Sequence, residues 1–435
     1  GMTITQAQTK TAANDGNYEH YLISVPLANP ALIDINGAAG DKDRLVVFGT
    51  AEPDRFTLDT ITSGTVGRAT ASNQATSVIT HENVEFVEFN TGGEDDRFAV
   101  QAIHVQTTIN TGMGDDRVLL GSNANVGTLT NTLGNVDAIN ALLRINGQGT
   151  GDNDSLQLDD TGDTKSNFGT VTASSISNGL TAFTGGSYLL MGASGSILYS
   201  GIELLGINLG NALVTAPDFN GNVITVETTH SQTTRITSGS GNDLLNFESV
   251  FGPTELHTGD GNDVVRVGST TGDFGQFQAD KTIDQTIEPP DSVLNNGGTS
   301  YFTGRLDIFA DGGSTDRLKI FDNDDASDEA GTLTGTEITG LGLIGGIGYD
   351  GFEILLLKLA KGNTNLYVES THTGSTEIHM GHQSPVVGLS NDEVNINAIT
   401  GITTINGGQG NDVFHVNYDR DGNPTLLNGI AGILN

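Results

Sequence analysis

Glycines and acids recur together along this chain, and their spacing suits cation binding. The string NGGQGNDVFHV, from Asn406 to Val416, places Gly407, Gly408 and Gly410 before Asp412 and a short alternating stretch. Glycine takes positive backbone φ angles without steric cost, so the chain can turn sharply there and bring carbonyl oxygens close to a cation. Carbonyl and carboxylate oxygens are the ligands that calcium prefers. The string therefore predicts a calcium site.

Related strings occur elsewhere: TGMGDDRVLL from Thr111, SGSGNDLLNF from Ser238 and TGDGNDVVRV from Thr258. Looser relatives begin at Gly37, Thr91, Gly147 and Asp311. For the acids of three looser strings, Asp43, Asp154 and Asp316, calcium and a metal-free turn are equally good interpretations. The candidate metal ligands are the turn glycines and acids of the four best strings: Gly112, Gly114, Asp116, Gly239, Gly241, Asp243, Gly259, Gly261, Asp263, Gly407, Gly408, Gly410 and Asp412.

From Gly407 the string GGQGNDVFH matches the nonapeptide GGxGxDxUx and resembles the calcium-binding repeat of the RTX, or hemolysin-type, family. The resemblance implies Ca²⁺ as the ligand and a place within large secreted or surface bacterial proteins, including adhesins. In that family the nonapeptides follow one another directly, whereas here they are dispersed. Completion of each ligand shell by a neighbouring turn is therefore a hypothesis.

Three pairs of acids share one spacing: Asp96 and Asp116 (116 − 96 = 20), Asp243 and Asp263 (263 − 243 = 20), and Asp392 and Asp412 (412 − 392 = 20). That distance is about one coil of a wide parallel β-helix, so each pair is expected to stack acid above acid. An alternative needs no metal, because aspartate and asparagine also cap backbone amides in tight glycine turns.

The segments between these turns read as strands. Short runs such as YLISV, LVVF, EFVEF and RVLL are rich in β-branched and aromatic residues and are bounded by Gly, Asn, Asp and Thr. The sequence therefore predicts an all-β fold, a right-handed parallel β-helix (solenoid) with glycine-acid turns.

A longer repeat lies above the coil repeat. Tyr199 corresponds to Tyr349 (349 − 199 = 150) and Glu203 to Glu353 (353 − 203 = 150), and a shorter copy has HENVEF from His81 in that place. These copies predict three units: 18–145, 146–304 with an irregular loop at 271–303, and 305–435, expected to be truncated. Residues 1–17 are expected to form an N-terminal cap or a frayed segment.

The composition of the chain limits which classes of partner and site are expected. The 435 residues carry a formal net charge of −35, with 60 glycines and no cysteine. Few basic residues argue against nucleic acid and anionic membranes, and no stretch predicts membrane insertion. Missing cysteine excludes disulfides and zinc-thiolate sites. Acids placed at turn ends favour cations as the counter-charge.

An enzyme is disfavoured but left open, because no stretch singles out an acid and base pair. His372, His379 and His382 are candidate metal ligands, although His372 corresponds to His230 in the other long copy, which favours a role in the repeat. A carbohydrate-binding or polysaccharide-cleaving β-helix is the alternative function, and it would be sought at Tyr301, Phe302 and Arg305.

The favoured interpretation is a calcium-binding structural or adhesive segment of a larger secreted or cell-surface protein. Its expected partners are calcium and either surface glycans or neighbouring repeats of the same chain. The expected location is extracellular or the cell surface. A metal-free solenoid would show the same strands with empty turns.

Overall fold

The structure is a computed structural model that describes residues 2–4, 9–11, 20–24, 32–37, 42–61, 66–72, 76–149, 151–179, 189–212, 221–268, 298–323, 325–381, 390–420, 423–424 and 429–435. These residues form strands and turns without an α-helix, so the all-β prediction is confirmed. Accordingly, no apolar helix of membrane-spanning length occurs in the described ranges. The chain divides into two compact units: unit 1 comprises Gly1–Thr170 and Ser174–Gly210, and unit 2 comprises Val171–Ala173 and Asn211–Asn435.

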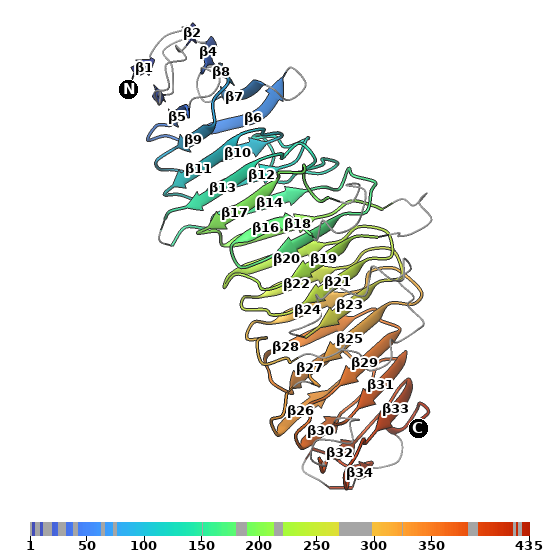
Figure 1. The fold of residues 1–435 in the computed structure, drawn as a ribbon. Helices are drawn as coiled ribbons and strands as arrows, with labels where there is room; N and C mark the ends of the chain where they lie inside the picture. Colours follow the sequence, from blue (N-terminus) through green and yellow to red (C-terminus); the bar gives the residue numbers. More distant parts are fainter. Residues whose placement is uncertain are drawn as a thin grey trace. The chain divides into compact units, whose positions relative to one another are not determined.

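In unit 1 the strands belong to two sheets, A and B, most of whose neighbours run parallel (Figure 1). The strands of sheet A are β1 (Met2–Ile4), β3 (His20–Ser24), β5 (Arg44–Phe48), β9 (Phe86–Asn90), β11 (Gln106–Gly112), β13 (Leu142–Gly147), β17 (Ser196–Ser200), β16 (Ser175–Asn178) and β15 (Phe168–Val171), whose last residue falls in unit 2. The strands of sheet B are β2 (Thr9–Thr11), β4 (Leu32–Asn36), β8 (Thr76–Glu82), β7 (Val66–Ser72), β6 (Arg55–Ile61), β10 (Arg97–Val100), β12 (Arg117–Leu120), β14 (Ser155–Asp159) and β18 (Leu204–Asn208).

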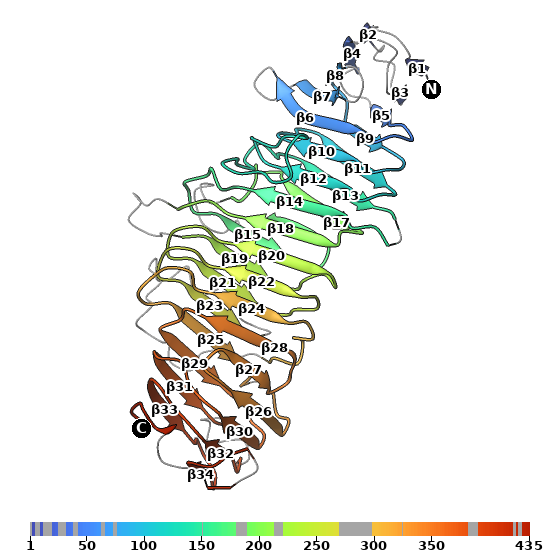
Figure 2. The same ribbon diagram turned by 180° about the vertical axis from the view of Figure 1, so that it is seen from behind.

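Unit 2 has the same two kinds of sheet (Figure 2). Its sheet A strands are β19 (Val223–Val226), β21 (Leu244–Phe247), β23 (Val264–Val267), β25 (Arg317–Phe321), β29 (Ile354–Lys358), β31 (Ser375–His379) and β33 (Ile402–Asn406). Its sheet B strands are β20 (Thr233–Thr237), β22 (Thr254–His257), β24 (Leu306–Phe309), β28 (Leu343–Asp350), β27 (Glu337–Gly340), β26 (Glu329–Leu333), β30 (Thr364–Val368), β32 (Glu393–Ile396) and β34 (Val413–Val416).

The parallel register aligns the turns that precede the strands. Arg97 pairs with Arg117, Leu244 with Val264, and Glu393 with Val413, so the acid before each strand lies next to the acid before its neighbour. The prediction that acids 20 residues apart stack is therefore confirmed. We call an acidic turn and the strand that follows it one level.

Among the described strands, antiparallel hairpins interrupt the parallel pattern at three places. They are β6–β7–β8, β16–β17 and β26–β27–β28. Each ends shortly before a glutamate, Glu85, Glu203 or Glu353, and the longer repeat aligns the last two. The structure thus links the long sequence repeat to a repeated excursion of the chain.

The core of unit 1 lies between its two sheets. Phe89 of β9 in sheet A contacts Phe56 of β6 and Phe98 of β10 in sheet B, with ring centroids 5.2 and 5.7 Å apart, and the latter two rings stack at 5.3 Å. All three side chains are fully buried. Alternation of buried and less buried residues along β6 is the pattern expected for a strand with one face in a core.

Several sequence predictions fall partly outside the described ranges. The expected N-terminal segment 1–17 contributes β1 and β2, and its other residues are not among those described. Of the predicted irregular loop 271–303, residues 298–303 are described, and they include a turn closed by the Phe302 amide on the Thr299 carbonyl at 2.9 Å. The proposed division into three repeat units stays a prediction.

Candidate functional site

All the predicted turn glycines except Gly407 have positive φ angles, which favour glycine. Gly259 and Gly261 have φ angles of +82° and +153°, which L side chains rarely adopt. A Cβ atom on Gly261 would lie 1.7 Å from the carbonyl oxygen of Gly241 in the adjacent turn. The same pair of positive φ angles occurs at the other predicted turns, in Gly112 and Gly114, Gly239 and Gly241, and Gly408 and Gly410. Stacking of turns therefore explains these glycines.

In unit 1 the turn acids form a chain of hydrogen bonds that we call the unit 1 ladder. Each backbone amide donates to the carboxylate of the next level, with N–O distances of 2.7, 2.7, 2.9 and 2.9 Å. The members, in order from donor to acceptor, are Asp54, Asp96, Asp116, Asp154 and Glu203. The carboxylates thus cap the amides that begin each strand.

Unit 2 contains an equivalent unit 2 ladder. The amides of Asp243, Asp263 and Asp316 donate to the carboxylate of the next level at 2.8, 2.7 and 2.7 Å. The members are Asn222, Asp243, Asp263, Asp316 and Glu353. A shorter ladder in the same unit joins Thr364, Asp392 and Asp412, with distances of 2.7 and 3.1 Å. The predicted ligands Asp116, Asp243, Asp263 and Asp412 are therefore all ladder members.

Each ladder carboxylate uses one oxygen for an amide, and several second oxygens form no hydrogen bond of normal geometry. The Oδ2 atoms of Asp96, Asp116, Asp243 and Asp263 are buried and form no such bond, although a hydroxyl of Thr91, Thr111, Ser238 or Thr258 lies near each carboxyl and lowers its pKa in part. Burial raises the pKa of Asp96 and Asp243 to about 7 and that of Asp263 to about 8, and it also raises the pKa of Asp116. Near neutral pH these oxygens require either a proton or a cation.

Turn carbonyls, which calcium would use as further ligands, already accept amide hydrogens from adjacent turns. The amide of Gly261 donates to the carbonyl of Gly312 at 2.6 Å, and that of Gly312 donates to Gly259 at 2.9 Å. In unit 1, Met113 donates to Gly92 at 3.1 Å. Each carbonyl keeps a second lone pair. The turns are thus stacked by direct bonds, and an ion would add to those bonds.

Glutamate ends both long ladders, a role that the sequence reasoning missed. Glu203 accepts from Asp154, Glu353 accepts from Asp316, and Glu85 accepts from Asp43 at 2.7 Å. All three follow an antiparallel hairpin, and the longer glutamate side chain reaches the amide of the preceding level. The signal was present in the repeat, because Glu203 and Glu353 are aligned in its two long copies.

The complete nonapeptide is the most exposed of the four predicted turns. Gly408, Gly410 and Asn411 are exposed, and the Asp412 side chain is partly exposed. The amide of Gly408 donates to Asn406 at 3.1 Å, and Asn411 donates to Asn391 at 3.1 Å. Its acid therefore stands nearer to solvent than Asp243 or Asp263.

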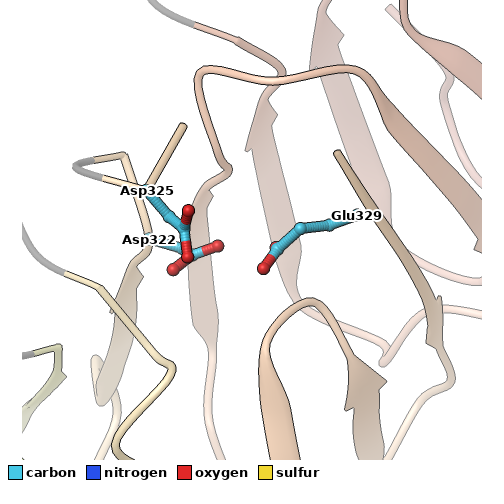
Figure 3. A group of neighbouring side chains, drawn as sticks. All are labelled: Asp322, Asp325 and Glu329. Carbon is cyan, nitrogen blue, oxygen red and sulfur yellow. The ribbon is translucent and has the colours of Figure 1, made fainter. Parts of the chain in front are cut away.

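A second acidic site was not anticipated from the sequence. The carboxyl groups of Asp322, Asp325 and Glu329, which we call the acidic cluster, face one another at the junction between β25 and β26 (Figure 3). One ligand oxygen from each lies within 4.8 Å of the others, and in the described ranges this is the one set of three or more acids or histidines so close together. The run DNDDASDE from Asp322 was the available signal, since five of its eight residues are acidic.

Burial and neighbouring charge shape the cluster. Burial raises the pKa of Asp322, and burial with the adjacent Asp322 raises that of Glu329 to about 8. Hydrogen bonds from Ser327 lower the pKa of Asp325. Two of its carboxyls therefore resist ionisation unless a positive species joins them.

The histidines show turn-forming contacts. Gly374 donates its amide to Nδ1 of His372 at 3.1 Å, and Nε2 of that ring lies 3.2 Å from the Ser375 carbonyl. His230, its counterpart, contacts Thr234 at 3.0 Å. His379 contacts Glu377 at 2.7 Å, and His382 lies outside the described residues. These contacts favour the interpretation that His372 has a role in the repeat.

The location expected for an aromatic, non-repeated site contains one exposed ring. Tyr301 is exposed, whereas Phe302 is buried in the core. Arg305 forms ion pairs with Asp307, at 2.8 Å, and with Glu337. A polar groove of about 420 Å³ lies elsewhere in unit 2, and its lining includes Tyr367, Glu393 and Arg420.

Comparison with known proteins assigns this chain to no family. Neither a protein-family model nor a curated protein sequence matches this chain.

Proposed function

We propose that this chain is a right-handed parallel β-helix that serves as a structural or adhesive segment of a larger secreted or cell-surface protein, stabilised by calcium. The long parallel sheets support the solenoid, because successive parallel strands such as β10, β12 and β14 are separated by strands of the other sheet, apart from the hairpins. The right hand follows from the strong preference of parallel crossover connections.

The ladders carry the functional proposal. Each ladder repeats one contact from level to level, in which the backbone amide of one acid donates to the carboxylate of the next. Both units contain such a ladder of aspartates. Catalysis needs a unique set of groups at one place, whereas a repeated contact stabilises length and regularity. Support or adhesion is therefore the function that this arrangement suits best.

Calcium is proposed as the ion that balances the buried carboxylates. The second oxygens of Asp96, Asp116, Asp243 and Asp263 form no hydrogen bond of normal geometry, and calcium binds carboxylate and carbonyl oxygens in irregular geometry. The chain has a net charge of −35, so self-repulsion also favours a cation. The resemblance of the Gly407–Asp412 turn to the RTX repeat points to the same ion. High calcium outside the cell would then favour the folded state.

Thermal unfolding with and without calcium tests this proposal. In chelator at about pH 8, where the ladder acids ionise, we expect a lower melting temperature, and added calcium should raise it by at least about 5 °C, as binding of several ions to the folded state requires. Calorimetric titration of the chelated protein should count several ions. Magnesium at equal ionic strength is the control. An unchanged melting temperature would leave the turns as metal-free caps.

Glycan binding is a second candidate. The groove near Tyr367 supports it, because an aromatic ring beside Asn365, Glu393, Asn395 and Arg420 offers a stacking face and polar partners for sugar hydroxyls.

A further inference from the structure

The acidic cluster has features that the ladders lack. Asp322 follows β25 directly, Asp325 lies in the next turn, and Glu329 is the first residue of β26. The Asp325 amide donates to the Asp322 carbonyl at 3.0 Å, and the Ser327 amide donates to Asp325 Oδ1 at 2.8 Å. The chain therefore folds back so that three acids converge.

The most buried member of the cluster points an unpartnered oxygen into it. Asp322 is 1% exposed, and its Oδ1 accepts the amide and the hydroxyl of Thr299 at 2.8 and 3.0 Å. Its Oδ2 and the Oε2 of Glu329 are both buried without a hydrogen-bond partner. Two neighbouring carboxyl groups with such oxygens require either a shared proton or a cation between them.

We propose that Asp322, Asp325 and Glu329 bind one divalent cation, with calcium the ion that fits best. This site is separate from the glycine turns and does not depend on their binding calcium.

The geometry and chemistry agree with a hard cation. All three ligands are carboxylate oxygens, without nitrogen or sulfur, and this set suits calcium, magnesium or manganese. Opposite ligands of calcium stand about 4.6 to 5.2 Å apart, twice the calcium–oxygen distance, whereas those of magnesium stand about 4.0 to 4.2 Å apart. The three oxygens all lie within 4.8 Å of one another, so they are close enough to reach one calcium ion.

An ion here would fix the base of the β26–β27–β28 hairpin. Glu329 begins that hairpin, while Asp322 and Asp325 hold Thr299 and Ser300, the latter by a hydroxyl bond of 3.0 Å to Asp325. One cation would thus join the end of β25, the start of β26 and the segment at Thr299.

A proton shared by Asp322 and Glu329 is the competing explanation, and Glu329→Gln separates the two. Glutamine donates a hydrogen bond as a protonated glutamate does, but it cannot supply a carboxylate. We expect the Glu329→Gln and Asp325→Asn variants each to lose one calcium in calorimetric titration of the whole chain, or to bind it at least tenfold more weakly. Asp328→Asn is the matched control, because it removes the same charge nearby and keeps the acceptor for the Asn363 amide.

The outcomes also separate this site from the turns. If Glu329→Gln still binds several ions but one fewer than the original chain, both proposals stand. If it binds none while the original chain binds one, the cluster stands and calcium at the turns fails. If Glu329→Gln and Asp325→Asn bind as many ions as the original chain and equally tightly, the cluster proposal is overturned. Retained melting temperature of Glu329→Gln in chelator shows that the variant is folded.

Discussion

The ladders and the acidic cluster use the same chemical group in opposite arrangements. A ladder holds one carboxylate per level, and each accepts an amide from the level before it, as Asp263 does from Asp243. In the cluster, three carboxyls converge within 4.8 Å of one another. Buried acids occur in both regions, so burial alone does not distinguish an amide cap from a cation site. The convergence of several carboxyl groups at one place distinguishes them.

The difference has a physical origin. A carboxylate that caps an amide gains a charge-assisted hydrogen bond, which offsets part of the cost of its burial. Converging carboxylates repel one another, and among the described residues no donor bonds Oδ2 of Asp322 or Oε2 of Glu329. Ions bound at the ladders would therefore add to levels that hydrogen bonds already join. An ion at the cluster, in contrast, would itself hold three segments together.

The largest expected effect concerns the stacking on which the ladders depend. In Gly261→Ala, the new Cβ would lie 1.7 Å from the Gly241 carbonyl at a φ of +153°, so adjacent levels must separate. We expect a loss of more than about 3 kcal/mol in the free energy of unfolding, seen as a large fall in melting temperature. Gly151→Ala is the control, because its φ is +92° and nothing lies within 4 Å. Equal losses in the two variants would contradict the stacking argument.

The amide cap can be separated from the charge at one ladder position. Asp263→Ala removes the acceptor of the buried Asp243 amide, so we expect a loss of about 1–3 kcal/mol. Asp263→Asn keeps a carbonyl oxygen for that amide and removes the charge. In chelator at about pH 8 it should be as stable as the original chain or more so. Denaturant unfolding followed by circular dichroism measures both, and an equal loss in both variants would mean that the negative charge itself is required.

The smallest expected effect is a pH dependence of the ladders. Burial raises the pKa of Asp96 and Asp154 to about 7 and that of Asp263 to about 8, against about 3.9 in the unfolded chain. Between these values the folded state keeps protons that the unfolded state releases, so stability falls as pH rises and is lost through about pH 7 to 8. The histidine His81, whose pKa burial lowers to about 3, adds no slope above about pH 7.

Melting temperatures in chelator between about pH 7 and about pH 9 measure this slope. We expect a decline of a few degrees, which calcium should reduce and Asp263→Asn should lessen. A flat profile in chelator would show that the ladder acids are ionised throughout and are balanced by their amide donors alone.

Much of the fold could be predicted from the sequence. Runs such as RVLL correspond to strands, and β12 spans Arg117–Leu120, because alternation and β-branched content favour extended structure whatever the partner strand. The spacing of Asp243 and Asp263 gave the register, since one coil repeats one length of chain. The antiparallel hairpins were missed because β7 and β8 alternate in the same way as parallel strands.

The sites were harder to predict. Glycines and acids marked the turns, but the inward direction of Asp116 and Asp243 depends on packing that a motif does not encode. The acidic cluster arises because the chain folds back after β25 and brings Glu329 to Asp322, a tertiary event. An acidic run alone predicts only a solvated surface.

The uniform ladder has a consequence for how such a chain can lengthen. Each ladder aspartate accepts an amide hydrogen from the level before it and donates its own amide to the carboxylate of the next level. Both sides of a level therefore make the same kind of hydrogen bond. If a duplicated stretch consists of whole levels, its last level can form the same hydrogen bond to the first level of its copy, and no side chain has to change. Glu203 and Glu353, 150 residues apart (353 − 203 = 150), occupy equivalent positions in two such copies. Duplication of a stretch in phase with the ladder would therefore lengthen the fold while keeping its contacts.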